Sequence, residues 1–150
     1  MRRERHWGAL QLVLAGLVSI SGAACGLQSD RREVPPDVAA VVDTVTEDID
    51  AERYEKIYQD ASDLWKQELT LEESTETFKT LRTKLGKVKG RTLHNATEQH
   101  NSGGPLQGEA YILTYRTEFE GGEGMETFTL VKRDGRWLLA RYFVNSMALK

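Results

Sequence analysis

The chain has little of the chemistry that usually marks a catalytic or metal site. It has a single cysteine, Cys25, in 150 residues, which excludes an intramolecular disulfide. Its three histidines, His6, His94 and His100, are scattered and do not suggest a metal site built from sulfur and imidazole. No Ser-His-Asp order is present, and the run NSGG lacks the Lys-Ser/Thr that completes a phosphate-binding loop. We therefore predict no catalytic residue, no metal and no cofactor.

The chain also lacks a basic stripe. Its formal net charge is -3, and because residues 1–25 hold three arginines and one glutamate, the remainder carries -5. Nucleic-acid binding needs clustered lysine and arginine, so no nucleic acid is expected as a partner. A content of 39% hydrophobic and 29% charged residues is typical of a soluble globular protein.

The first 25 residues have the pattern of an export signal. The charged start MRRERHW precedes the apolar run GALQLVLAGLVSI and the small residues SGAAC. The alternative is an uncleaved membrane anchor, because no charge occurs from Trp7 to Ser29. Against it, the strongly apolar part ends at Ile20, which is short for a span of ~20 residues.

The segment GAAC, residues 22–25, resembles the lipobox of bacterial lipoproteins, although Gly22 stands where leucine is usual. The resemblance implies a signal peptide over residues 1–24, cleavage before Cys25 and lipid attachment to the sulfur of Cys25. Two or three acyl chains would hold the protein at a membrane, since each buried CH₂ contributes ~0.8 kcal/mol. The alternative is a passive cysteine in a discarded leader.

Residues 25–36 form the predicted lipid-attached tether. The stretch after Cys25, GLQSDRREVPP, is polar and ends in two prolines. In lipoproteins of this kind, an aspartate after the cysteine tends to mean retention in the inner membrane, and this chain has Gly26 there. The resemblance thus implies an exported protein of the cell envelope, in the outer membrane facing the periplasm if the host has two membranes.

Residues 37–150 are predicted to form one α+β domain. Helical spacing of apolar residues predicts a first helix from Pro36 to about Ile49, a bend at DIDAER, and a second helix from Tyr54. Leu64 and Trp65 are interpreted as a hydrophobic plug. A third helix begins at the capping box TLEE and ends at Gly86, which suits a left-handed stop.

After Gly86 the pattern alternates, as in strands. We predict four of them in GRTLHNATEQ, EAYILTYRTEF, METFTLVKR and RWLLARYFV, with flexible loops at HNSGGP and EGGEG. Asp134-Gly135 predicts a tight hairpin turn. The expected architecture is three N-terminal helices packed on a bent, four-stranded antiparallel sheet.

This order of elements resembles the nuclear transport factor 2-like (cystatin-like) superfamily, whose members form a cone with a pocket between sheet and helices. Within it, residues 51–93 and the segment DGRWLLARYFV are similar to the domain of unknown function 4019 family of small exported bacterial proteins. The resemblance implies a fold and no established activity. Superfamily members often dimerise through the sheet, which leaves a homodimer open.

Three residues are candidates for lining such a pocket. Tyr54 and Tyr58 lie one helical turn apart, with ordinary core tyrosines as the alternative. A two-residue Asp134-Gly135 turn pairs Leu130 with Leu139 and turns Arg141 toward the core side, where it could bind an anion. A three-residue loop pairs Leu130 with Leu138 instead and turns Arg141 to solvent. Both registers stay open.

Two carboxylates flank the EGGEG loop, Glu118 and Glu126. They could form a pair, but we expect surface charges beside a hairpin loop. For function, the favoured hypothesis is a membrane-tethered, non-catalytic module that binds a small ligand or an envelope protein. The alternative is an isomerase- or hydrolase-like enzyme that uses the cone. A cone filled by Phe78, Leu81, Leu113 and Phe128 would argue against the enzyme.

Overall fold

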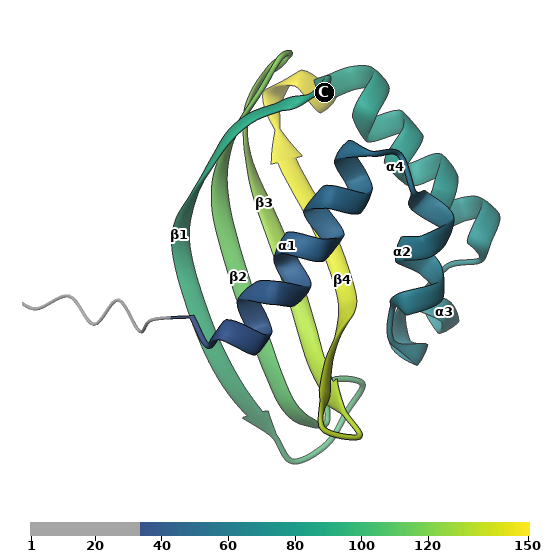
Figure 1. Ribbon diagram of the computed structural model, residues 1–150, viewed down its shortest axis with the longest axis vertical. Helices are drawn as coiled ribbons and strands as arrows, with labels where there is room; N and C mark the ends of the chain where they lie inside the picture. Colours follow the sequence, from purple (N-terminus) through teal and green to yellow (C-terminus); the bar gives the residue numbers. More distant parts are fainter. Residues whose placement is uncertain (1–33) are drawn as a thin grey trace, which may run out of the picture.

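The computed structural model describes residues 34–150. Its elements are α1 (Pro36–Asp50), α2 (Tyr54–Asp60), α3 (Asp63–Glu68), α4 (Leu71–Leu85), β1 (Val88–Asn101), β2 (Gly108–Phe119), β3 (Gly122–Arg133), β4 (Arg136–Ser146) and the 3₁₀ turn η1 (Met147–Leu149). The strands form one antiparallel sheet in the order β1-β2-β3-β4. The sheet curves around the helices (Figure 1). The α+β prediction is confirmed, with four helices in place of three.

The start of α4 follows the predicted capping box. The Thr70 backbone N–H donates to Glu73 Oε2 at 2.8 Å, and the Glu73 backbone N–H donates to Thr70 Oγ1 at 3.2 Å. These two bonds satisfy N–H groups that the first helical turn leaves without a partner. A local four-residue pattern therefore sets where this helix begins.

The segment around Trp65 is the additional helix. α3 carries Trp65 into the core, where its Nε1–H donates to Ser74 Oγ at 3.1 Å. The Ser62 backbone N–H donates to the carbonyl of Leu139 at 2.8 Å, so the chain entering α3 joins the outer edge of β4. Leu64 packs on the opposite face of the sheet, against Ala110, Val131 and Ala140. The predicted plug is thus a short helix at the β4 edge whose Trp65 and Leu64 contact the two opposite faces of the sheet.

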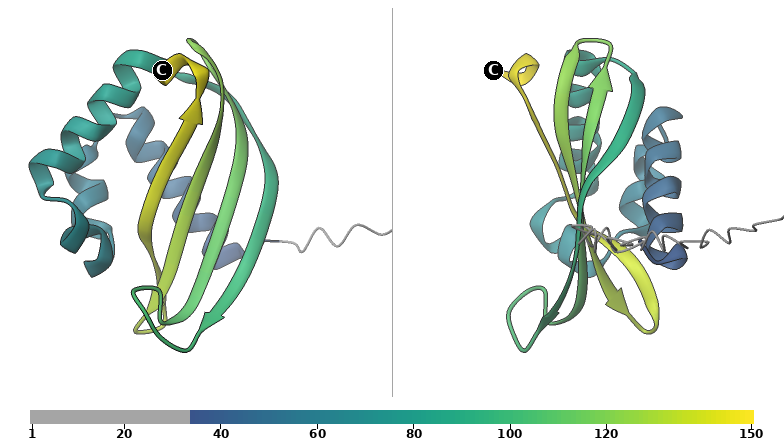
Figure 2. Two further views of the ribbon diagram at one scale, coloured as in Figure 1. Left: turned by 180° about the vertical axis from the view of Figure 1, so that it is seen from behind. Right: turned by 90° about the vertical axis from the view of Figure 1, so that its left-hand side faces the viewer.

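The alternation predicted for β2 is confirmed. Tyr111, Leu113, Thr117 and Phe119 are buried on the face that meets the helices, and Tyr115 is half-buried there. Seen from behind, the other face carries no described helix across β1, β2 and β3 (Figure 2). The main core therefore lies between the concave face and the helices.

A continuous series of aromatic rings fills that core. Phe78 of α4 stacks on Tyr54, Trp65 and Tyr142, with ring centroids 5.6–5.9 Å apart. Phe128 continues the series to Tyr142 at 5.0 Å and to Tyr115 at 5.7 Å. Each such pair adds ~0.5–1.5 kcal/mol beyond its buried area. The rings link α2, α3 and α4 to β2, β3 and β4.

The two glycine-rich connections differ from each other. Asp134 and Gly135 have φ of 51° and 76°, as a two-residue turn with positive φ at both positions requires, so the tight hairpin is confirmed. The EGGEG segment is not the flexible loop that we predicted. Phe119 pairs directly with Gly122, and the Gly121 N–H donates to the carbonyl of Leu85 at 2.8 Å. This turn is tight because it docks on the end of α4.

Candidate functional site

Tyr54 and Tyr58 do not line an interior pocket. Tyr54 is 5% exposed and stacks on Phe78, while Tyr58 is half-buried against the main core. Burial, and then the negative charge of Glu52, raise the pKa of Tyr54. Both residues fit the alternative of core tyrosines. Tyr54 also borders a shallow depression between α2 and α4.

Arg141 faces away from the core because of a β-bulge. The two-residue turn sets Lys132 opposite Trp137 and Leu130 opposite Leu139, but the register then shifts, so that Thr129 faces Arg141. Ala140 is the extra residue of the bulge. The register of the two-residue turn therefore holds only from Arg133 to Leu130, and the Leu130–Leu138 pairing of the alternative register does not occur. The bulge nevertheless turns Arg141 to solvent, as that alternative expected.

Beyond the bulge, Arg141 reaches α3. Its guanidinium Nη2 lies 2.6 Å from Glu68 Oε1, and both side chains are about half exposed. The hydrogen bond that Arg141 donates to Glu68, together with the negative charge of Glu68, raises the pKa of Arg141. This surface ion pair replaces the anion site that one register predicted. Cys25 lies outside the described residues.

Glu126 is the buried carboxylate that our sequence analysis placed on the surface. Its side chain has no exposed area, whereas that of Glu118 is 63% exposed, as expected. The missed signal is alternation, since Glu126 shares a face with the buried Phe128 and Leu130. Because the EGGEG turn is tight, this position lies well inside the sheet.

All four strands contribute a residue to this carboxylate cluster. Arg91 of β1 donates to Glu126 Oε2 through Nε at 2.5 Å and to Oε1 through Nη2 at 3.2 Å. Thr117 of β2 donates to Oε2 at 2.5 Å, and Tyr142 of β4 donates to Oε1 at 2.6 Å. Both carboxylate oxygens are therefore satisfied, as a buried charge requires.

The cluster leaves almost no room for a substrate. The cavity beside it has a volume of about 20 Å³ and is lined by Phe78, Leu85, Arg91, Glu126, Tyr142 and their neighbours. Such a space holds roughly one water molecule. Burial, and then the charge and hydrogen bond of Glu126, raise the pKa of the Tyr142 hydroxyl well above 10. The arrangement suits a stabilising cluster better than proton transfer to a ligand.

A much larger hollow lies elsewhere, in a groove of about 670 Å³ between α1, the α2–α3 segment and the start of β4. We call it the α1–α2 groove. Its volume is within the usual range for small-molecule sites, ~300–1,000 Å³. It opens to solvent. Its apolar lining residues are Val41, Val45, Ile57, Ala61, Trp137 and Leu139.

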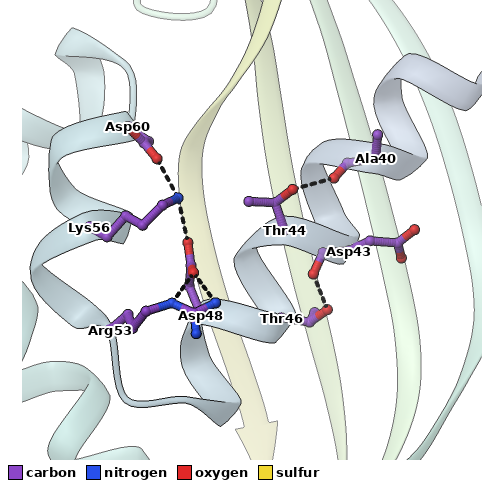
Figure 3. A network of polar contacts seen from close by, with 8 residues as sticks. All are labelled: Ala40, Asp43, Thr44, Thr46, Asp48, Arg53, Lys56 and Asp60. Atoms are coloured by element: carbon purple, nitrogen blue, oxygen red, sulfur yellow. Dashed lines mark hydrogen bonds and ion pairs between the residues drawn. The ribbon is translucent and has the colours of Figure 1, made fainter.

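A salt-bridge network at the junction of α1 and α2 supplies two residues of the groove wall, Asp48 and Asp60 (Figure 3). The buried Asp48 carboxylate accepts from Arg53 at 2.7 Å and from Lys56 at 3.0 Å, and Lys56 also bonds Asp60 at 2.7 Å. Burial would raise the pKa of Asp48, but the hydrogen bonds from Lys56 and Arg53 outweigh it and lower the pKa. The network ties the two helices together and neutralises the acids there.

Three cations that line the groove have no carboxylate partner within residues 34–150. Lys66 donates to the carbonyl of Gln59 at 2.8 Å, and Arg133 donates to the carbonyls of Gln107 and Lys132. The side chain of Arg136 is exposed and makes no hydrogen bond or ion pair with any residue from 34 to 150. Arg133 and Arg136 flank the β3–β4 turn. We call the part of the groove that these three cations line the groove mouth.

Comparison with known proteins gives a family. The family model described as a protein of unknown function, DUF4019, matches residues 41–142. The chain belongs to this family. The match spans α1 to β4 and includes both the carboxylate cluster and most of the groove, and the predicted family membership is confirmed. A search of curated proteins finds no match.

Within residues 34–150, no three residues among histidine, cysteine, aspartate and glutamate are grouped so that they could hold a metal ion. Over the same range, no helix is both long enough and apolar enough to cross a membrane.

Proposed function

We propose that this DUF4019 protein is a lipid-anchored, non-catalytic binding domain of the bacterial cell envelope and that the α1–α2 groove is its binding surface. The observation that carries the binding role is the contrast between two spaces. The groove offers about 670 Å³ and is open to solvent, whereas the space beside the buried carboxylate offers about 20 Å³. A ligand of ordinary size fits only the first.

The filled interior also supports a binding role over an enzymatic one. Phe78, Leu113 and Phe128 are each at most 2% exposed, so the residues of a filled cone occupy the space between sheet and helices. We further propose that the curved sheet and its helices are a nuclear transport factor 2-like cone whose pocket has closed. Binding would then have moved from the cone to the groove beside it.

The anchor would place this groove near a bilayer. Cys25 carries the lipid in this proposal, and α1 begins at Pro36. The connecting residues can span at most ~40 Å even when fully extended. Because α1 lines the groove at Ala40 and Val41, about one turn beyond Pro36, the groove would stay near the membrane surface.

The anchor is tested by metabolic labelling with palmitate. Cys25→Ser should abolish labelling and release the protein from membranes. Unchanged labelling would show that lipid is attached elsewhere or that the assignment of a lipoprotein is wrong.

The groove is tested by site-specific photo-crosslinking in cells. A benzophenone amino acid at Thr44, an exposed residue that lines the groove, should give a discrete adduct that mass spectrometry can resolve. The matched control is Glu47, which is exposed on the same helix but does not line the groove. The same adducts from both positions, or none from either, would contradict a binding role for the groove.

A further inference from the structure

We propose that the α1–α2 groove binds an anionic amphiphile, with the hydrocarbon against the groove floor and the acid head at Lys66, Arg133 and Arg136. This inference rests on the groove being the binding surface proposed above. It adds the chemical class of the ligand, which is an aliphatic chain that ends in a carboxylate or a phosphate.

The floor of the groove suits hydrocarbon. Val41, Val45, Ile57 and Leu139 supply aliphatic side chains, and Trp137 supplies an indole. The Trp137 Nε1–H donates to Asp37 at 3.1 Å, so the polar atom of this side chain is already satisfied. A ligand that lies on this floor therefore meets carbon and gains from burying its own apolar surface.

The part of the groove lined by Asp48 and Asp60 would not hold a charged head group. Asp48 and Asp60 are both bonded to Lys56, and Asp48 also to Arg53. These bonds occupy the charged groups on both sides. An acid or a base added there would have to break an existing ion pair, so the head group belongs at the mouth.

The cations of the mouth have no carboxylate partner, and the side chain of Arg136 is free to bind an anion. Within the described part of the chain, no carboxylate forms an ion pair with Lys66, Arg133 or Arg136. Two acids, Asp63 and Asp134, also line the groove, and neither forms an ion pair with any of the three. Arginine binds carboxylate and phosphate through two parallel hydrogen bonds, which suits both head groups.

The placement of two of these arginines is costly to the fold. Arg133 and Arg136 are direct cross-strand partners on either side of the Asp134-Gly135 turn. Like charges opposite one another destabilise an antiparallel pair. A bound anion would relieve this repulsion, and the pair would supply two guanidinium groups to one acid.

The test measures binding of dodecanoate to the full natural chain, purified from membranes and held in phosphatidylcholine nanodiscs. Radiolabelled dodecanoate is followed by equilibrium dialysis, with empty nanodiscs subtracted. We expect one saturable site. Arg136→Gln should weaken binding about tenfold, which corresponds to the loss of one charge-assisted contact. The matched control is Arg116→Gln, an exposed arginine outside the groove, which should bind as the natural chain does.

Two comparison ligands and one variant complete the design. Dodecyl phosphate should compete with dodecanoate, and dodecyltrimethylammonium should not. Thr44→Trp should abolish binding by filling the groove. Equal binding of the cationic amphiphile, or equal loss in the Arg116 and Arg136 variants, would overturn the proposal.

The source of the acid is separated by a second nanodisc composition. Competition of dodecanoate by phosphatidylglycerol nanodiscs would support a membrane lipid as the ligand, and saturable binding without such competition would support a free acid. Absence of saturable binding would overturn the ligand class. If the crosslink from position 44 persists in that case, only the ligand class fails, and if the crosslink is also absent, the proposed function fails with it.

Discussion

Arg91 and Glu126 form an ion pair across an intervening strand, with 2.5 Å between Nε and Oε2. Arg91 comes from the edge strand β1 and Glu126 from β3, while Thr117 of β2 lies between them and bonds the same carboxylate. The Arg91 side chain is only 16% exposed and that of Glu126 is fully buried. The pair therefore joins the edge strand to the middle of the sheet through a contact that solvent barely reaches.

We expect Arg91→Met to reduce the free energy of unfolding by about 3–5 kcal/mol, because it leaves a buried carboxylate without its cation. The double variant Arg91→Met, Glu126→Met should recover part of this loss, since it removes the unpaired charge. Urea denaturation gives the values for both. Arg116→Met, at an exposed position of β2, is the control. A loss at Arg91 no larger than that of the control would contradict a structural role for the pair.

Tyr142 makes the stability of the fold depend on pH in the alkaline range. Its pKa is well above 10 in the folded state because of burial first and then the charge and hydrogen bond of Glu126. The unfolded chain ionises this tyrosine near pH 10. Its contribution to stability is therefore fully present below pH ~10 and is lost as the pH rises from there toward the folded pKa.

Tyr142→Phe should flatten this alkaline loss and, near neutral pH, cost ~1–3 kcal/mol because Glu126 loses a hydrogen-bond donor. Denaturant unfolding at a series of pH values gives the change in the free energy of unfolding with pH, and absorbance at 295 nm follows tyrosine ionisation directly. The natural chain should show one more tyrosine that resists ionisation until unfolding than the variant does. If the free energy of unfolding falls with alkaline pH equally in the natural chain and the variant, other groups control this loss.

Local signals in the sequence predicted the helices and strands well. Contacts between segments that are distant in the chain have no such local signal and were not predicted. Thr70 and Glu73 are three residues apart, so their capping box can be recognised without any tertiary structure. The side to which Arg141 points depends on a bulge at Ala140, which has no comparable local mark. The alternation in β3 could have placed Glu126 inside the sheet, but the residue that makes its burial tolerable, Arg91, is 35 positions away.

The α1–α2 groove could not be predicted either, because its residues lie far apart in the chain. Its walls come from α1, from the α2–α3 segment and from the β3–β4 hairpin, which are separated in the chain and meet only in the folded protein. The sequence indicated a pocket between sheet and helices only through its resemblance to the nuclear transport factor 2-like superfamily. The aromatic rings that fill this space belong to six different elements, and their mutual fit depends on tertiary packing.

Gly86 should not tolerate any side chain. Its φ of 74° agrees with the predicted positive φ. Its ψ of −157° lies outside the left-handed helical region, in a part of φ/ψ space that almost only glycine adopts. An added Cβ would also lie 2.6 Å from Glu120 Oε2 and 2.8 Å from Glu120 Cβ. Gly86→Ala should therefore lower the free energy of unfolding by ~1–3 kcal/mol or more.

The control for Gly86 is Gly103→Ala in the β1–β2 loop. An added Cβ at Gly103 meets no atom within 4 Å, and its φ is not positive. Thermal unfolding of the two variants side by side should show a clear loss of melting temperature for Gly86→Ala and almost none for Gly103→Ala. Equal melting temperatures would mean that the end of α4 adapts to a side chain at this position.

Two buried serines should respond oppositely to the same substitution. The Ser74 hydroxyl accepts the Trp65 indole N–H at 3.1 Å, whereas the Ser62 hydroxyl has no hydrogen-bond partner among the described residues. Ser62 is 1% exposed and Ser74 is fully buried, so solvent cannot compensate either of them. Ser74→Ala would leave the indole N–H of Trp65 without an acceptor, which costs ~1–3 kcal/mol.

Ser62→Ala, by contrast, removes a polar atom that gains nothing from its burial, so the free energy of unfolding should stay the same or rise slightly. The Ser62 backbone N–H bond to Leu139, which holds the β4 edge, does not involve the hydroxyl and remains in the variant. Urea denaturation of the two alanine variants provides the comparison. A loss at Ser62 as large as that at Ser74 would indicate that the Ser62 hydroxyl has an acceptor in solution, for example a buried water.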